Sequence, residues 1–249
     1  MSGKIRKLSD CMLAAGLAFS SGGRRQPISF VDIGSRGGLA RNWAVLDSLG
    51  LLRPVFFEPD LDAHTMISAR HPGAAIFGEA VWSRAGVLPL HVTAHAGCSS
   101  LLRPAYDSRL PAVFRDMLGI VRVVDVETVR ADEVLRAHPD LVPEIVKIDV
   151  QGGELEVLRG FGDALQTVVC VELEVSFIRM YDDQPLFDEV YAFLVEAGFG
   201  LIELRPFGVR STGNAVQANA FFVRQQPANA RQVLVGEVFR RVSSVPRYH

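Results

Sequence analysis

The chain has 249 residues, of which 49% are hydrophobic and 22% charged, a composition that suits a globular protein with a full core. Its formal net charge of −2 gives no general positive field, so we do not expect a nucleic-acid partner. The three cysteines, Cys11, Cys98 and Cys170, are odd in number and widely spaced. They predict neither a disulfide framework nor a zinc site, and they favour a cytoplasmic setting.

The N-terminal stretch superficially resembles a secretory signal, because basic residues precede the apolar run CMLAAGLAFS. However, Asp10 adjoins this run, and its apolar residues recur at helical spacing: Leu8, Met12, Ala15 and Phe19. We therefore predict an amphipathic helix rather than a signal peptide. No run of about 18 apolar residues occurs, so we expect no membrane-spanning helix and no membrane partner.

The first half of the chain alternates strands and helices. Apolar runs, helical spacing and stop signals predict, in order, a strand at 28–33, a helix at 39–49, a strand at 54–58, a helix from the N-cap Asp60 to about 70, and a strand at 74–81. Such a β-α-β-α-β pattern implies a parallel sheet with right-handed crossovers.

Residues 83–130 break this rhythm. They suggest a strand at 87–92, a loop at 96–102, a helix at 106–118 and an exposed strand at 121–129. We interpret this block as an elaboration around the mouth of an active site, and not as a separate domain.

The regular pattern then returns. It predicts a helix at 131–137, a strand at 144–150, a glycine turn and helix at 151–160, a strand at 167–174, a helix at 186–197, strands at 199–204 and 218–224, and a helix at 229–242. The connection between the last two strands is too short for a crossover helix, so they must be antiparallel. The expected organisation is one domain over 1–249, with a helical extension (1–27), a core (28–224) and a helical tail (225–249).

The stretch FVDIGSRGG (30–38) and the acid Glu58 after the second strand are typical of sheets that hold an adenosine-bearing cofactor. A nicotinamide-binding domain would prefer G-x-G-x-x-G in a parallel sheet, and the segment 34–37, GSRG, does not match that motif. The antiparallel pair at the end of the chain instead favours S-adenosylmethionine-dependent methyltransferases. An acid after the second strand can accept hydrogen bonds from both ribose hydroxyls.

At this level of detail the chain resembles the FkbM-type methyltransferase family. The matching stretches are FVDIGSRGG, FFEPD, CSSLL, KIDVQGGELEVLRG, VCVELEVSF, MYDDQPLFDEVYAFLVEAGF and QANAFFVR, which span about residues 28–224 in family order. The resemblance implies a three-layer, Rossmann-like class I methyltransferase fold, whose seven-stranded, mostly parallel sheet ends in an antiparallel hairpin. It also implies S-adenosyl-L-methionine as the cofactor. The implied reaction is methyl transfer to a hydroxyl oxygen of a small molecule or sugar.

The residues expected to bind the cofactor lie at the ends of the first three strands and of the strand at 144–150. They are Asp32, Gly34, Ser35, Arg36, Gly38, Glu58, Glu79, Ala80 and Asp149. Arg36 and Gly37 depart from the residues common in the family, and Arg36 could itself pair with the methionine carboxylate. Asn219 replaces the aspartate common before the last strand, which we expect to concern folding.

An alcohol that attacks a methyl group needs a proton acceptor, and the candidates are Asp149, Glu174 and His95. For Asp149 the competing interpretation is a capping acid for the turn that follows. Glu154 could be either functional or a first-turn acid favoured by the helix dipole. A cation shared by Asp149 and Glu174 is an alternative route, although we predict no metal site. Ser99 and Ser100 could meet cofactor or substrate, or form a local turn.

Three alternatives to small-molecule O-methylation stay open at this point. The enzyme could methylate nitrogen, it could act on a protein, or the chain could be a cofactor-binding module without catalysis. The presence of Asp32, Gly34, Glu58 and Asp149 argues against the last of these. A homodimer is also left open.

Overall fold

The computed structural model describes residues 26–105, 110, 112–207 and 215–243. Its main sheet has seven strands in the order β3-β2-β1-β7-β8-β10-β9. They are β1 (Ile28–Ile33), β2 (Leu52–Phe57), β3 (Ala75–Phe77), β7 (Ile145–Ile148), β8 (Cys170–Ser176), β9 (Phe199–Phe207) and β10 (Gln217–Arg224). The first five in this order are parallel, and β10 runs antiparallel to both neighbours. The predicted sheet with its terminal hairpin is confirmed.

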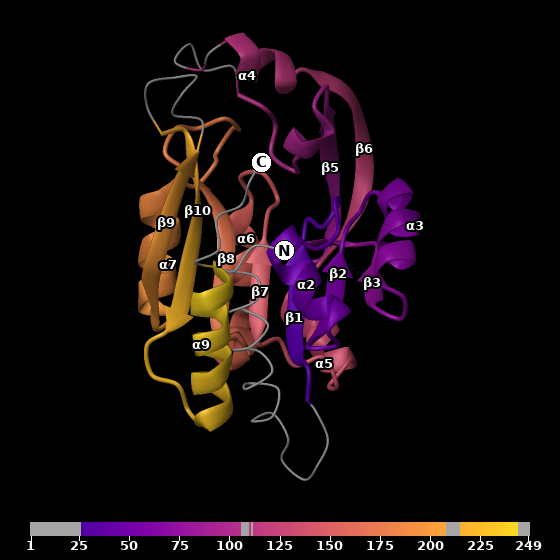
Figure 1. Cartoon of the computed structure of the whole chain (residues 1–249). Coiled ribbons are helices and arrows are strands. Elements are labelled where there is room, and N and C mark those ends of the chain that lie inside the picture. Colours follow the sequence, from indigo (N-terminus) through magenta and orange to yellow (C-terminus); the bar gives the residue numbers. More distant parts are fainter. Residues whose placement is uncertain (1–25, 106–109, 111, 208–214, 244–249) are drawn as a thin grey trace.

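Helices cover both faces of this sheet (Figure 1). On one side lie α2 (Arg41–Ser48), α3 (Leu61–Arg70) and α9 (Ala230–Ser243), and on the other α5 (Ala131–Ala137), α6 (Glu154–Gly160) and α7 (Phe187–Glu196). In β1 every residue is buried, and Phe30 packs into the first layer while Val31 packs into the second. This burial on both faces explains why the central strands read as continuous apolar runs.

Local signals set several element ends as predicted. The side chain of Asp60 accepts a hydrogen bond from the Asp62 N–H at 3.1 Å and caps α3. Gly50 and Gly198 follow α2 and α7 with φ values of +65° and +87°, where a residue with a side chain would be strained. The strand predicted at 167–174 begins later, because a 3₁₀ helix, η2 (Gly162–Thr167), takes up its first residue.

One strand prediction was wrong. The segment 74–81 does not form one strand but two, which belong to different sheets. β3 joins the main sheet, while β4 (Ala80–Val81) joins a second sheet with β5 (Gly86–Thr93) and β6 (Ile120–Val129) in the order β4-β6-β5. The chain changes partner at 78–79, and an apolar pattern carries no information about which partner a strand selects.

The second sheet, with the 3₁₀ helix η1 (Ala96–Cys98) and α4 (Ala112–Met117), is the block that interrupts the regular pattern. Its two ends meet, because the Trp82 N–H donates to the Val129 carbonyl at 2.9 Å. The indole of Trp82 then packs on α6. A Cβ at Gly153 would lie 2.3 Å from this ring, and a Cβ at Gly160 would lie 2.2 Å from the Trp82 carbonyl oxygen. Glycine at both positions therefore lets the block join the main fold closely.

Two predicted elements lie wholly or partly outside the described residues. They are the N-terminal helix around 8–19 and the first residues of the helix at 106–118, of which α4 is the described portion. Within the described residues, no helix has the length and apolar character needed to cross a bilayer.

Candidate active site

A cavity of about 1030 Å³ opens where the carboxyl ends of β1, β2 and β7 face the second sheet. We call its main-sheet side the strand-end wall, formed by Ile33, Gly34, Arg36, Gly37, Phe57 to Ala63, Met66, Arg70 and Asp149 to Gln151. We call the other side the small-sheet wall, formed by Ala80 to Trp82, Leu90, Val92, Ala96, Gly97, Ser99 to Leu101, Arg122, Val124 and Val126. Its volume lies at the upper end of the range for ligand pockets, roughly 300–1,000 Å³.

The glycine turn after β1 brings three strand ends together. Gly34 has a φ of +77°, and its N–H donates to the Phe57 carbonyl at 3.0 Å. A Cβ on Gly34 would lie only 2.0 Å from the Asp149 carbonyl oxygen. Only glycine therefore allows β1 and β7 to approach closely enough to form one continuous floor.

Glu58 follows β2 and is nearly buried, with 5% of its surface exposed, yet it lines the cavity. Burial raises the pKa of its carboxyl group, whereas the hydrogen bond that Oε1 accepts from the Asp60 N–H at 2.9 Å lowers it. The Glu58 carbonyl lies 2.6 Å from His64 Nε2, which ties this corner to α3. A hydrogen-bond acceptor is thus held rigidly at the edge of the cavity.

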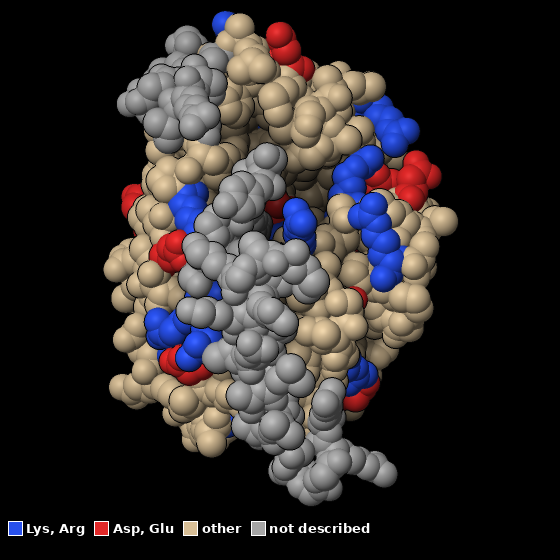
Figure 2. All heavy atoms as spheres, viewed as in Figure 1, with Lys and Arg blue, Asp and Glu red and all other residues tan. Residues whose placement is uncertain are grey.

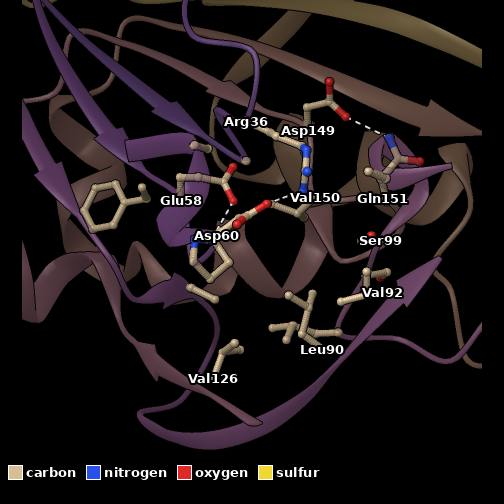
Figure 3. A pocket seen from close by; sticks show the side chains of 18 of the residues that line it. Arg36, Glu58, Asp60, Leu90, Val92, Ser99, Val126, Asp149, Val150 and Gln151 are labelled. Carbon is tan, nitrogen blue, oxygen red and sulfur yellow. Dashed lines mark hydrogen bonds and ion pairs between the residues drawn. The ribbon is translucent and has the colours of Figure 1, made fainter. Parts of the chain in front are cut away.

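Arg36 also lines the cavity, but its guanidinium forms an ion pair with the Asp60 carboxylate (Figure 3). A second arginine, Arg70 on α3, donates to the Gly37 carbonyl at 3.0 Å. The two arginines therefore brace the turn 34–38 against the start of α3. The expected pairing of Arg36 with the methionine carboxylate stays a prediction, and in this structure the guanidinium is paired with Asp60.

The end of β7 carries a hydrogen-bonded triad of side chains. Gln151 Nε2 donates to Asp149 Oδ1 at 2.9 Å and to Glu174 Oε1 at 3.1 Å. Asp149 and Gln151 line the cavity and lie together in Figure 3. Glu174 lies on β8 outside the cavity lining, and Gln217 also donates to it. The amide nitrogen occupies the point between the two carboxylates where a shared cation would have to sit.

Two buried residues, Glu154 and Tyr181, hold this triad in place. Gln151 has a φ of +58°, unusual for a residue with a side chain, and the Glu154 carboxylate stabilises the turn by accepting the N–H groups of Val150 and Gly152 at 3.2 and 3.1 Å. The Tyr181 hydroxyl lies 2.8 Å from the Cys98 carbonyl and 3.3 Å from Gln151 Oε1. Its single proton serves one of these acceptors at a time.

Burial makes these acids reluctant to ionise. Desolvation, and then the nearby charges of Asp149 and Glu154, raise the pKa of Glu174 well above its ordinary value. Desolvation likewise raises the pKa of Glu154 to about 7, against the hydrogen bonds that its carboxylate accepts. Glu174 and Glu154 therefore keep their protons to a higher pH than ordinary carboxyl groups do.

Five of the predicted residues line the cavity: Gly34, Arg36, Glu58, Ala80 and Asp149. Six others lie away from its lining as the described residues define it: Asp32, Ser35, Gly38, Glu79, Glu174 and His95. Asp32 is fully buried and bonds to Lys147 Nζ at 3.1 Å, beneath the floor of the cavity. His95 is exposed beside η1, and its ring lies 3.7 Å from the Cys98 thiol.

Two residues of the site were not predicted. Lys147 reaches both Asp32 and, at 3.7 Å, Asp149 Oδ2, so it links the two strands beneath the cavity. The sequence could have indicated this lysine, because it lies within the apolar run EIVKIDV and a buried charge requires a partner. Tyr181 gave no such signal, because its loop reaches Gln151 only through the tertiary fold.

No group of three or more His, Cys, Asp or Glu residues in the described ranges is arranged to hold a metal ion. The polar contacts of the strand-end wall are instead made by carboxylates, amides and backbone groups. This chemistry suits an organic ligand with hydroxyl and amino groups.

The sheet order, with its antiparallel last hairpin, and the cavity at the carboxyl edge are the arrangement of a class I methyltransferase fold. A family model described as the methyltransferase FkbM domain matches residues 53–201, which is more than half of the sequence. The chain belongs to the FkbM methyltransferase family. This membership confirms the predicted class of enzyme and the predicted methyl donor, S-adenosyl-L-methionine.

Among curated proteins, hexuronic acid methyltransferase AglP of Haloferax volcanii is 42% identical over 50 residues. The match covers 20% of this chain and 21% of that protein, so it spans about a fifth of the relative.

Two solved structures show a distant likeness of fold. Magnesium protoporphyrin IX methyltransferase from Synechocystis PCC 6803, with bound S-adenosylmethionine, is 11% identical, with a TM-score of 0.44 over 89% of this chain and 80% of that one. The glycopeptide N-methyltransferase MtfA is 11% identical, with a TM-score of 0.37 over 87% and 95%.

Proposed function

We propose that this methyltransferase transfers the methyl group to a hydroxyl oxygen of a small molecule or sugar. The observation that carries the proposal is the construction of the cavity, in which Glu58 and Asp149 on one wall face an apolar wall on the other (Figure 3). The name of the curated relative, a methyltransferase for a hexuronic acid, supports a sugar as the acceptor.

The residues present fit the cofactor. A Cβ at Gly37 would meet nothing within 4 Å, so the backbone of this turn is open to a ligand. Glu58 offers a buried carboxylate to the ribose hydroxyls, and charge-assisted hydrogen bonds of this kind are among the stronger ones. Ala80 and Val81 supply an apolar edge for the adenine ring. The roles of Gly34 and Arg36 in this scheme are to shape and brace the turn.

When bound, S-adenosylmethionine supplies an activated methyl group on a sulfonium centre, and the protein supplies alignment and a proton acceptor. Asp149, the carboxylate that lines the cavity at the end of β7, takes the hydroxyl proton as the oxygen attacks. Gln151 orients Asp149 through the 2.9 Å hydrogen bond, and Glu174 anchors the same amide from behind. Glu174 is thus a positioning residue in this proposal, and His95, which is exposed beside η1, takes no part in it.

The alternatives to this function predict different behaviour. A nitrogen acceptor would be favoured by incorporation of labelled methyl into amines, and a protein acceptor by incorporation into polypeptide. A non-catalytic module would bind the cofactor without turnover. A cytoplasmic location and a homodimer are also part of the proposal, and neither enters the chemistry above.

The experiment that tests the cofactor site is calorimetric titration with S-adenosylmethionine and S-adenosylhomocysteine. Glu58→Gln, which removes the charge and keeps the shape, should weaken binding by about 1–3 kcal/mol. Glu133→Gln, at an exposed position in the first turn of α5, is the matched control and should leave binding unchanged. Binding that is unaffected by Glu58→Gln would remove Glu58 from the site, and methylated amines as the sole products would overturn O-methylation.

A further inference from the structure

Three arginines line the cavity, and they differ in what holds their charge. Arg36 is paired with Asp60, and Arg70 donates to the Gly37 carbonyl, so both are part of the strand-end wall. Arg122, on β6, belongs to the small-sheet wall. Within the described residues it has no ion-pair partner, in contrast to Arg36.

The register of the small sheet explains why Arg122 has no acidic neighbour. It lies opposite Val92 of β5, and Leu90 lies opposite Val124. Side chains two residues apart on a strand share a face, so Arg122, Val124 and Val126 all face the cavity. The acids of the same strand, Asp125 and Glu127, lie at the alternate positions, so their side chains project to the opposite face of the sheet.

Arg122 is also the only charged residue among those that form the small-sheet wall. Its neighbours there are aliphatic side chains, small residues and serines. Arg122 is exposed at the cavity, so an anion can reach its guanidinium group directly. Figure 2 shows several Lys and Arg side chains beside the hollow on this face, together with some acidic side chains.

We propose that the methyl acceptor carries a carboxylate, which Arg122 binds while the hydroxyl group is held at Asp149. The planar guanidinium matches a carboxylate in a bidentate arrangement, and one arginine neutralises one carboxylate. A phosphate dianion would call for more than the single cation that this wall offers. The inference rests on the proposed function, because it concerns the acceptor of the same reaction.

The test uses binding as well as turnover. Glycosides of uronic acids, each paired with the neutral hexoside of the same stereochemistry, are titrated into the complex with S-adenosylhomocysteine and assayed for methyl transfer. We expect uronates to bind at least about 10-fold more tightly than their neutral partners. Arg122→Gln should reduce uronate affinity and kcat/KM about 10- to 100-fold and leave the neutral sugars within about 3-fold.

Two control variants distinguish the contribution of the positive charge from that of the planar guanidinium group, and from effects that any loss of a surface arginine would have. Arg122→Lys should restore only part of the uronate preference, because an ammonium group lacks the planar fork. Arg84→Gln, at an exposed position in the turn between β4 and β5 and outside the cavity lining, should change nothing.

The inference is overturned if uronates and hexosides bind equally, if none of them binds, or if Arg122→Gln weakens both classes alike. It is also overturned if sugar phosphates bind as tightly as uronates through Arg122. Arg122-dependent uronate binding without methyl transfer would support the inference and refute the proposed function, so the two can fail separately.

Discussion

The two walls of the cavity are built in opposite ways. On the strand-end wall the polar side chains have partners. Arg36 forms an ion pair with Asp60, Glu58 accepts a hydrogen bond from the Asp60 N–H, and Asp149 accepts one from Gln151. On the small-sheet wall the side chains are mainly aliphatic, and Val124 remains 41% exposed. One wall is fixed by hydrogen bonds to the sheet, and the other is a largely apolar surface with one cation.

This difference indicates a division of labour. A ligand that is common to a whole enzyme family needs a rigid, directional site, which hydrogen bonds and glycine turns provide. An acceptor that differs between enzymes can be selected by shape, apolar area and a single charge. Substitutions on the strand-end wall should therefore affect folding, cofactor binding and chemistry, whereas those on the small-sheet wall should affect the acceptor alone.

The largest effect is expected at Gly34. Gly34→Ala places a Cβ 2.0 Å from the Asp149 carbonyl oxygen, so the ends of β1 and β7 must separate. The free energy of unfolding should fall by more than about 4 kcal/mol, and cofactor binding should be lost as well. Gly50→Ala is the matched control, because Gly50 also has positive φ but a Cβ there would meet nothing within 4 Å. It should cost only about 1–2 kcal/mol in denaturant titrations. Equal losses would refute the steric argument.

Next in size is the chemical effect at Asp149. Asp149→Asn keeps an oxygen that can accept from Gln151 but removes the proton acceptor, so kcat should fall about 10²- to 10⁴-fold. Cofactor affinity, measured by calorimetry, should change much less than kcat. Asp125→Asn, on the face of β6 that points away from the cavity, is the control. Normal turnover in the Asp149 variant would exclude Asp149 as the base.

A smaller effect, on stability rather than on rate, is expected at Glu154. Because burial raises the pKa of Glu154 from 4.5 to about 7, the folded state favours its protonated form. This contribution to stability is complete below about pH 4.5 and is lost as the pH rises through 7. Glu154→Gln should therefore lessen the decline in unfolding free energy between pH 5 and pH 8 by roughly 1–3 kcal/mol.

The measurement is urea unfolding at both pH values, and Glu133→Gln serves as the exposed control. A Glu154→Gln protein with the same pH dependence as the parent would show that Glu154 is ionised throughout this range.

The smallest effect should come from the apolar wall. Val124→Ala should change stability by no more than about 0.5 kcal/mol, because the side chain is 41% exposed. It should raise the KM for the acceptor about 2- to 10-fold through lost apolar contact, with cofactor affinity unchanged. Val123→Ala, one residue earlier on the other face of β6, should leave KM unchanged. A lower cofactor affinity in Val124→Ala would contradict the conclusion that the small-sheet wall affects only the acceptor.

The same contrast governs what the sequence could predict. The strand-end wall follows from local patterns, since an apolar run, a glycine turn and an acid after the next strand occupy consecutive segments of the chain. Gly34, Glu58 and Asp149 were accordingly expected at the cavity, and they line it. Asp32 was expected there too, but its partner Lys147 lies on the neighbouring strand, 115 residues away in the chain. Such a pairing depends on strand register, which one sequence does not reveal.

The small-sheet wall was less accessible to prediction. Strands were expected at 87–92 and 121–129, and β5 and β6 lie there with slightly wider bounds. The pairing of β6 with Ala80–Val81 was not expected, because β4 has only two residues and closely follows β3 in the sequence. The place of Gln151 between two carboxylates was also hidden, because it depends on a positive φ at a residue that is not glycine. Which acid faces the cavity, Asp149 or Glu174, is therefore a property of the folded turn.

The hydrogen bond between the Trp82 N–H and the Val129 carbonyl has a further consequence, for how such an enzyme can diversify. The segment between these residues leaves the main fold and rejoins it at this point, so lengthening or shortening it adds little loop-closure entropy. It also contacts the loop after β8, because the Ala105 N–H donates to the Met180 carbonyl and the Asp182 N–H donates to the Arg103 carbonyl, both at 2.8 Å. An exchange of this segment between relatives must therefore retain Trp82, the glycines beneath it and the contacts with Met180 and Asp182. Acceptor choice can then evolve or be engineered while the methyl-donor half stays constant.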